Sequence, residues 1–254
     1  MSNIVAIARR ELRSYFASPI AYVVVGLFAL AFGYFHIIML SYFVQQSMQG
    51  AIGGGGPMNV NRDLIRYALQ NIAVVILFLV PLITMRTYSE EKRSGTIELL
   101  LTSPVSDLQI MLGKFFGAMA LYGVMLAVTL VHIGLLFVYG NPEWRPIASC
   151  YLGLLLLGGC MVSVGLFFSS LTKNQIVAAV LTFVTLLLLW IIDWSTTFTS
   201  TGLGTLLNYL SLTSHLDDFT KGVIDTKHVI YYLSVITFGL FLTSKSVDSE
   251  RWRG

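Results

Sequence analysis

Six apolar runs, separated by short polar stretches, dominate the pattern of hydrophobic and polar positions along the chain. A membrane-spanning helix needs about 20 mostly apolar residues. The pattern predicts spans at 19–43, 67–85, 115–139, 148–170, 174–192 and 229–243. The last run is short, and Lys227 and Lys245 at its ends can reach toward the membrane surfaces to make up the length. We therefore expect an all-α integral membrane protein, with residues 1–254 forming a single transmembrane domain.

The first 17 residues have the period of an amphipathic helix that lies in the membrane interface. Apolar residues fall on one face, and Arg9, Arg10 and Arg13 fall on the other. Such a helix turns its cations toward anionic lipid headgroups. Glu11 lies close to the apolar stripe, so we expect it to pair with a base or with a backbone donor. A simple anchor of positive charge explains the arginines equally well.

A segment rich in charged residues separates the second and third apolar runs at residues 88–106, with the sequence YSEEKRSGTIELLLTSPVS. Tyr88–Arg93 reads as a charged helical stub, and Gly95 is a natural stop because glycine tolerates the left-handed conformation that ends helices. Thr96 can then cap a short helix over 97–101, with Glu98 near its positive end, until Pro104 breaks it. This short helix suits a groove on a soluble partner, although its leucines could also seat against the bundle itself.

The helix that leads into the third span has a sequence signature of its own at its start. Ser106 and Gln109 have the spacing of a capping box, in which each side chain bonds to the backbone of the other. Val105 and Ile110 are placed to form the accompanying hydrophobic staple. The segment therefore predicts helix, break, short helix, break, helix.

Between the last two runs, residues 193–228 form a semi-apolar region that could hold two short helices. Its polar residues Asp193, His215, Asp217 and Asp218 do not have the spacing of a known metal site, so we expect a solvated rim and no metal. His36 and His132 each lie alone inside a predicted span. Each can line a pathway or bond to a nearby carbonyl.

The composition agrees with a lipid environment. The chain has 56% hydrophobic and only 11% charged residues, whereas soluble domains have about 25% charged residues. A net charge of +3 argues against nucleic acid as a main partner. The two cysteines form no C-x-x-C motif, and we find no phosphate-binding loop, nucleophile elbow or zinc-protease motif. The chain is therefore expected to be non-catalytic.

The positions of the lysines and arginines predict the orientation in the membrane. Cytoplasmic flanks carry an excess of these residues. One set of flanks, made of the N-terminal arm, the 86–114 loop, Lys173 and the C-terminal tail, holds eleven, and the opposite set holds five. Both termini and the 88–106 segment are therefore expected in the cytoplasm.

Six spans, an amphipathic arm with Arg10-Glu11-Leu12 and the stretch EEKRSGTIELLLTSPVS together resemble the permease subunit of ABC-2 type transporters. The resemblance is strongest at 90–114, and within the family it is greatest to the gliding-motility-type bacterial permeases. It implies a cytoplasmic coupling helix, re-entrant outer helices within 193–228, a place in the bacterial inner membrane and export driven by ATP. The coupling residues implied are Glu90, Glu91, Arg93, Gly95, Thr96, Ile97, Glu98, Leu99, Leu100 and Pro104.

The resemblance also implies partners and a pathway. No nucleotide-binding domain is fused, so two copies of a separate ABC ATPase subunit would bind ATP and Mg, leaving no cofactor in this chain. The permease would pair with a second copy or with a related subunit, in contact with membrane lipid. The second and fifth spans would line the pathway, with the polar candidates Gln70, Asn71, Thr84, Gln175, Thr182 and Thr185. The substrate stays open.

Two other functions remain open at this point. A secondary carrier or channel would need no ATPase, but it would need charged or paired polar groups at mid-membrane, and these are scarce here. A structural membrane anchor for a motility or secretion machine would need only the spans and the docking segment.

Overall fold

The structure is a computed structural model that describes residues 3–53, 58–97, 105–196 and 209–251, and every regular element in these ranges is helical. In chain order, the long helices are α1 (Asn3–Ala17), α2 (Pro19–Gly53), α3 (Arg66–Thr84), α6 (Asp107–Tyr139), α7 (Trp144–Leu171), α8 (Gln175–Thr196) and α11 (Thr226–Arg251). Shorter elements are the π-helix η1 (Val60–Ile65), α4 (Ser89–Ser94) and α10 (Leu216–Thr220).

Among the described residues, six helices are long and apolar enough to cross a membrane, which confirms the predicted fold class. The sixth, Thr226–Glu250, has 25 residues. It is longer than the short apolar run of the sequence because its polar last turns continue the helix beyond the apolar part.

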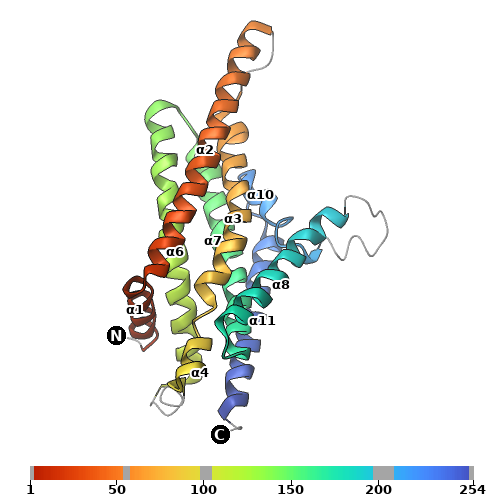
Figure 1. Ribbon diagram of the computed structural model, residues 1–254. Helices are drawn as coiled ribbons and strands as arrows, with labels where there is room; N and C mark the ends of the chain where they lie inside the picture. Colours follow the sequence, from red (N-terminus) through yellow and green to blue (C-terminus); the bar gives the residue numbers. More distant parts are fainter. Residues whose placement is uncertain (1–2, 54–57, 98–104, 197–208, 252–254) are drawn as a thin grey trace.

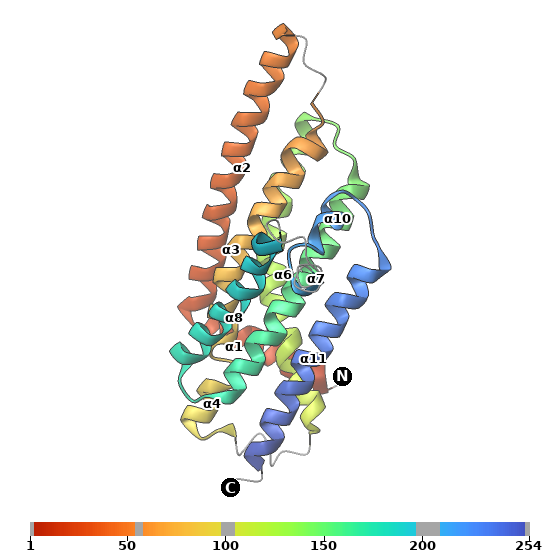
Figure 2. The same ribbon diagram turned by 90° about the vertical axis from the view of Figure 1, so that its right-hand side faces the viewer.

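The helices form an elongated bundle, with both chain termini at the same end (Figure 1). That end, here called the terminal end, also holds α1 and α4, whereas η1 and α10 lie toward the opposite end (Figures 1 and 2). Helix α2 extends beyond the other helices at the opposite end. The described parts of the predicted coupling segment, residues 88–97 and 105–106, therefore lie on the same side of the bundle as the two termini.

Helices α3 and α7 form the centre of the bundle. In their most apolar stretches 61% and 67% of the residues are buried, against 22% for α2 and 17% for α8. Small residues on α7 allow the close packing: a Cβ added to Gly158 would lie 2.2 Å from the Tyr122 ring, and one added to Gly165 would lie 2.1 Å from the Thr84 hydroxyl. The apolar outer faces of α2 and α8 are left for lipid or for another protein chain.

Two expected elements fall wholly or partly outside the described residues. Of the predicted short helix over 97–101, the structure describes Ile97, which is helical and buried. Glu98, Leu99, Leu100 and Pro104 lie outside the described ranges. In the 193–228 region, α10 is described and residues 197–208 are not, so the re-entrant helices remain a prediction.

Candidate functional site

At the terminal end, helix α1 is seated directly against α6. A Cβ added to Gly113 would lie 2.6 Å from the Ile7 Cβ, and one added to Gly117 would lie 2.6 Å from the Glu11 Cβ. These two glycines, one helical turn apart, let the two backbones approach closely. The amphipathic helix therefore rests on protein, and its arginines Arg9, Arg10 and Arg13 stay exposed.

A fully buried cation, Lys114, lies at the centre of this end. Its ammonium group contacts the Glu91 carboxylate at 2.8 Å and the Glu11 carboxylate at 3.1 Å. It also donates a hydrogen bond to the Thr87 carbonyl oxygen at 2.8 Å and lies 5.0 Å from the centre of the Tyr88 ring. The Lys114 side chain thus joins α1, the end of α3, α4 and α6. Of the two partners expected for Glu11, a base or a backbone donor, the structure has the base.

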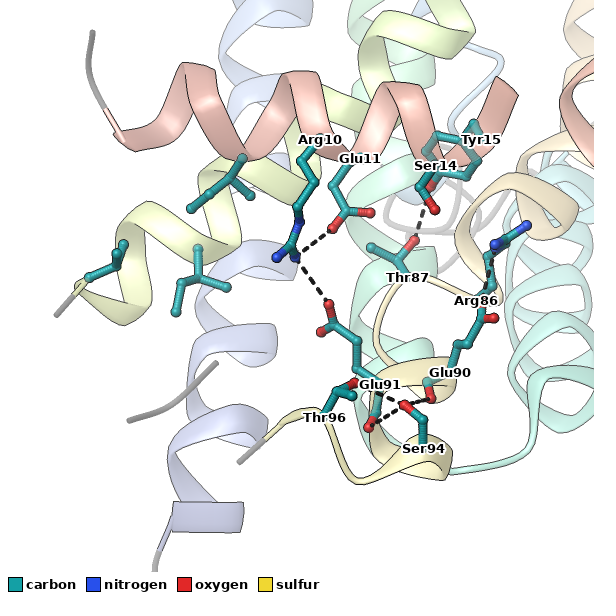
Figure 3. A pocket seen from close by; sticks show the side chains of 13 residues that line it. Arg10, Glu11, Ser14, Tyr15, Arg86, Thr87, Glu90, Glu91, Ser94 and Thr96 are labelled. Carbon is teal, nitrogen blue, oxygen red and sulfur yellow. Dashed lines mark hydrogen bonds and ion pairs between the residues drawn. The ribbon is translucent and has the colours of Figure 1, made fainter. Parts of the chain in front are cut away.

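Arg10 completes the cluster from its exposed side. Its guanidinium lies 3.4 Å from both Glu11 and Glu91, with 58% of the side chain exposed (Figure 3). Exposed pairs of this kind stabilise a protein by only about 0–1 kcal/mol. The buried Lys114 is therefore the cation that holds the two carboxylates together.

A second link between α1 and the core is the phenol of Tyr15. Burial raises the pKa of Tyr15 well above its ordinary value, so the phenol keeps its proton. It donates a hydrogen bond to the Ile83 carbonyl oxygen at 3.0 Å and lies 3.2 Å from the Thr87 hydroxyl. The end of α1 is thereby tied to the last turn of α3.

Helix α4 is anchored on its remaining sides by α7 and α11. The Ser169 hydroxyl of α7 accepts hydrogen bonds from the backbone N–H groups of Tyr88 at 3.0 Å and Ser89 at 3.2 Å. Lys92, with 2% of its side chain exposed, pairs with Glu250 of α11 at 2.8 Å. A displacement of α4 would therefore be felt by α1, α6, α7 and α11.

The predicted local geometry around α4 is confirmed at both described ends. Gly95 is the C-cap of α4, with a φ of 75° in the left-handed region, where a side chain would be strained. Ser106 caps α6, and with Gln109 it forms the expected capping box. Thr96 lies next to Ser94, with 2.8 Å between the two hydroxyl oxygens.

These elements enclose an open cavity of about 710 Å³ between α1, α4 and the start of α6 (Figure 3). Charged and hydroxyl side chains form much of its wall, with a few apolar ones: Ile7, Arg10, Glu11, Ser14, Tyr15, Arg86, Thr87, Glu90, Glu91, Ser94, Thr96, Val105 and Ile110. Thr96 and Val105 belong to this wall, so the cavity lies next to the described ends of the predicted coupling segment.

The structure brings together only part of the predicted coupling set. Glu91 points to Lys114, whereas Glu90 pairs with Arg86 along its own helix at 3.0 Å. Arg93 lies exposed on α4. In the sequence, Lys114 is only the last of the basic residues in the 86–114 loop. Lys114 lies between Gly113 and Gly117, and Glu11 interrupts the apolar stripe of the N-terminal helix. Together these two features were the signal that could have identified the pair.

The pathway candidates are dispersed. Gln70 donates hydrogen bonds to Asp217 at 3.1 Å and Thr220 at 3.3 Å, which join α3 to α10. Asn71, Thr84 and Thr182 each bond to a backbone carbonyl four residues earlier in their own helix. Gln175 begins α8, and Thr185 is half-buried on it. Their pathway role stays a prediction.

The histidines differ from the expectation. His215 was expected in a solvated rim, but it is only 5% exposed because its ring packs between Tyr209, Tyr231 and His228. His36 and His132 were read as solitary, but their ring centres lie 5.3 Å apart, and the Nδ1 atoms of both are buried without a hydrogen-bond partner. The sequence places the members of each pair too far apart for the pairing to be read from spacing.

The six candidate spans define the class of the protein, which is a multi-pass α-helical membrane protein. A cavity lined by charged side chains lies at its terminal end. Residues 44–215 match the family model described as ABC-2 family transporter protein. The match covers more than half of the chain, which therefore belongs to the ABC-2 transporter family. The prediction of an ABC-2 permease is confirmed at this level.

Curated relatives are similar over a shorter stretch. The "Probable multidrug ABC transporter permease YbhR" of Escherichia coli strain K12 is 29% identical over 118 residues, which are 46% of this chain and 32% of that protein. The protein with the same name from Escherichia coli O157:H7 matches to the same extent. The chain thus spans about a third of the length of the curated relatives that it matches.

Proposed function

We propose that this chain is the non-catalytic permease component of an ATP-driven ABC exporter. A separate ABC ATPase subunit would dock on the terminal end, against α4 and the 95–106 segment. The observation that carries this proposal is the Lys114 cluster. A docking element transmits force only if it is rigidly joined to the spans. Buried contacts join α4 to α6, α7 and α11, and Lys114 of α6 extends this link to Glu11 of α1.

The mechanism follows from these contacts. Closure of two ATPase subunits on ATP would press on the coupling segment, whose predicted members run from Glu90 to Pro104. Glu91 and Lys114 would pass the displacement to α6 and α1, and Ser169 and Glu250 would pass it to α7 and α11. ATP and Mg would be bound by the ATPase subunits, so this chain would need no cofactor.

The complete transporter would contain two permease chains, either identical or related. The outer faces of α2 and α8 support this arrangement because they carry exposed large apolar side chains, such as Leu30, Tyr34, Ile176 and Val180. Lipid would cover whatever part of these faces the second chain leaves open. Gln70, Thr182 and the other polar candidates on α3 and α8 would then line or support the pathway.

The proposed location is the bacterial inner membrane, with both termini in the cytoplasm. The flanks at the terminal end hold eleven lysines and arginines and the opposite flanks hold five, which supports this orientation. Drug export, the activity in the printed name of the curated relatives, is the first activity to test. The finer assignment to the gliding-motility type rests only on the resemblance of residues 90–114 to those permeases.

The test is ATP hydrolysis by the chain co-expressed with the ABC ATPase subunits of its own genome and reconstituted in lipid. Arg93→Glu reverses an exposed charge on α4, and Arg145→Glu makes the same change at the exposed start of α7, at the opposite end. We expect the first to lower hydrolysis and efflux of a hydrophobic dye, and the second to leave both unchanged. Equal activity of both variants would remove the proposed docking face.

The two alternative functions give different results in the same preparation. A secondary carrier or channel would move substrate in liposomes that contain no ATPase subunit and no ATP. A structural anchor would bind its machine without raising ATP hydrolysis. ATP-dependent transport that is lost with Arg93→Glu is the result that only the ABC permease gives.

A further inference from the structure

A second built site lies toward the opposite end, where α10 meets the start of α11. His228 Nε2 lies 2.8 Å from Asp218 Oδ2, and a carboxylate oxygen of Asp225 joins them, with all three ligand atoms within 4.8 Å of one another. His228 is buried, with 6% of the residue exposed. The three residues follow residue 215, the last residue that matches the family model.

The row of contacts behind His228 has one more short contact than two neutral histidines can fill with hydrogens. His215 Nε2 lies 3.0 Å from the Tyr209 carbonyl oxygen, and His215 Nδ1 lies 2.6 Å from His228 Nδ1. Together with the contact between His228 and Asp218, this row contains three short contacts, and each needs one hydrogen or one cation. Two neutral histidines supply only two N–H groups. The row therefore requires one further cation, either a proton or a metal ion.

The tautomers indicate where that cation lies. A carbonyl oxygen only accepts, so a neutral His215 donates from Nε2 and accepts at Nδ1 from the Nδ1–H of His228. The Nε2 lone pair of His228 then faces the Asp218 carboxylate. An outer hydrogen bond that fixes the other ring nitrogen in this way is the usual support of a metal-binding histidine.

We propose that Asp218, Asp225 and His228 bind a zinc ion that fastens α10 and the following turn to the start of α11. An imidazole with two carboxylates suits zinc better than magnesium or calcium, which prefer oxygen ligands alone. Two ligands of a tetrahedral zinc ion lie about 3.3 Å apart, because each is about 2.0–2.2 Å from the metal. His228 Nε2 and Asp218 Oδ2 are 2.8 Å apart here, so the ion would move these two atoms about 0.5 Å further apart.

Two lysines compete with the ion. Lys227 Nζ lies 3.0 Å from Asp225 Oδ2, and Lys221 Nζ lies 3.6 Å from Asp218 Oδ1. Both side chains are well exposed, at 61% and 44%, so they can swing into water when a metal takes their place. Removing the competing charge should therefore strengthen the binding of zinc, a sign that a purely structural ion pair would not give.

The experiment measures zinc binding to the full chain, purified in detergent and stripped with a chelator, by competition with a chromophoric chelator. We expect one zinc ion per chain. Asp225→Asn and His228→Gln should each weaken binding at least about tenfold. The matched control is Asp248→Asn, because Asp248 lies on α11 like His228 but near the other end of that helix, where it pairs with Lys245. It should bind zinc like the unchanged chain.

Zinc-free thermal unfolding and helical circular dichroism of each variant show whether it is folded, so a folded variant that loses zinc supports the proposal. Lys227→Met should bind zinc more tightly; unchanged or weaker binding would mean that Asp225 is not a ligand. An unchanged chain that binds no zinc would overturn the proposal and assign the extra charge to a proton. Zinc binding that survives both ligand substitutions would overturn it as well.

Discussion

Replacement of Lys114 by methionine is the perturbation that the terminal-end cluster makes most informative. The change keeps the length of the side chain but removes the cation, so Glu11 and Glu91 remain with side chains only 12% and 19% exposed. Breaking a buried ion pair by removing one partner costs about 3–5 kcal/mol. If the loss falls on the contact of α1 with the bundle, that corresponds to about a 140-fold to 3,700-fold change in the equilibrium between bound and released α1, because about 1.4 kcal/mol is tenfold.

Two further variants separate this effect from ordinary loss of packing. Arg10→Met removes the exposed cation of the same cluster and should cost only about 0–1 kcal/mol. Lys114→Met combined with Glu11→Gln and Glu91→Gln leaves no uncompensated buried charge. This triple variant should recover most of the loss, because replacing a whole buried ion pair is often close to neutral.

The assay is limited proteolysis with trypsin in detergent, together with thermal unfolding. Arg9 and Arg13 lie on the exposed face of α1, and the rate of cleavage after them reports how often α1 leaves its seat. We expect fast cleavage for Lys114→Met, and slow cleavage for Arg10→Met and for the triple variant. A loss for Lys114→Met no larger than that for Arg10→Met would refute the reasoning.

Three further predictions concern the same end of the molecule and are read by thermal unfolding. Gly117→Ala should destabilise the protein by about 1–3 kcal/mol because the added Cβ overpacks α1. Gly123→Ala on the same helix has no neighbour within 4 Å and should be neutral or stabilising by up to about 1 kcal/mol. Equal results for the two variants would contradict the close packing of α1 on α6. Gly95→Val should cost about 1–2 kcal/mol because of its positive φ, and an unchanged stability would argue against the left-handed cap. Tyr15→Phe should cost about 1 kcal/mol by leaving the Ile83 carbonyl without its phenol donor, and no loss would show that this bond contributes nothing.

Local signals in the sequence predicted the parts of the fold that depend on neighbouring residues. Apolar runs gave the spans, Gly95 the end of α4, and Ser106 with Gln109 the start of α6. Each rests on a rule that acts within a few residues. The length of the sixth span was underestimated because a helix can continue through polar residues once it leaves the apolar layer.

The candidate sites depend on contacts between distant residues, so the sequence showed only fragments of them. Glu11 was expected to find a base, but nothing local identified Lys114, 103 residues away, as that base. The histidine row was missed for the same reason. His215 and His228 are 13 residues apart, and only the turn between α10 and α11 brings their rings together.

The most direct test of the central claim is to locate the ATPase on the permease by site-specific cross-linking. Both native cysteines are buried, so a cysteine introduced at an exposed position reacts selectively. Arg93→Cys on α4 should cross-link to the ATPase subunit in the assembled complex, and Arg145→Cys at the opposite end should not. An ATPase that co-purifies in full yield but cross-links only from position 145 would contradict the account.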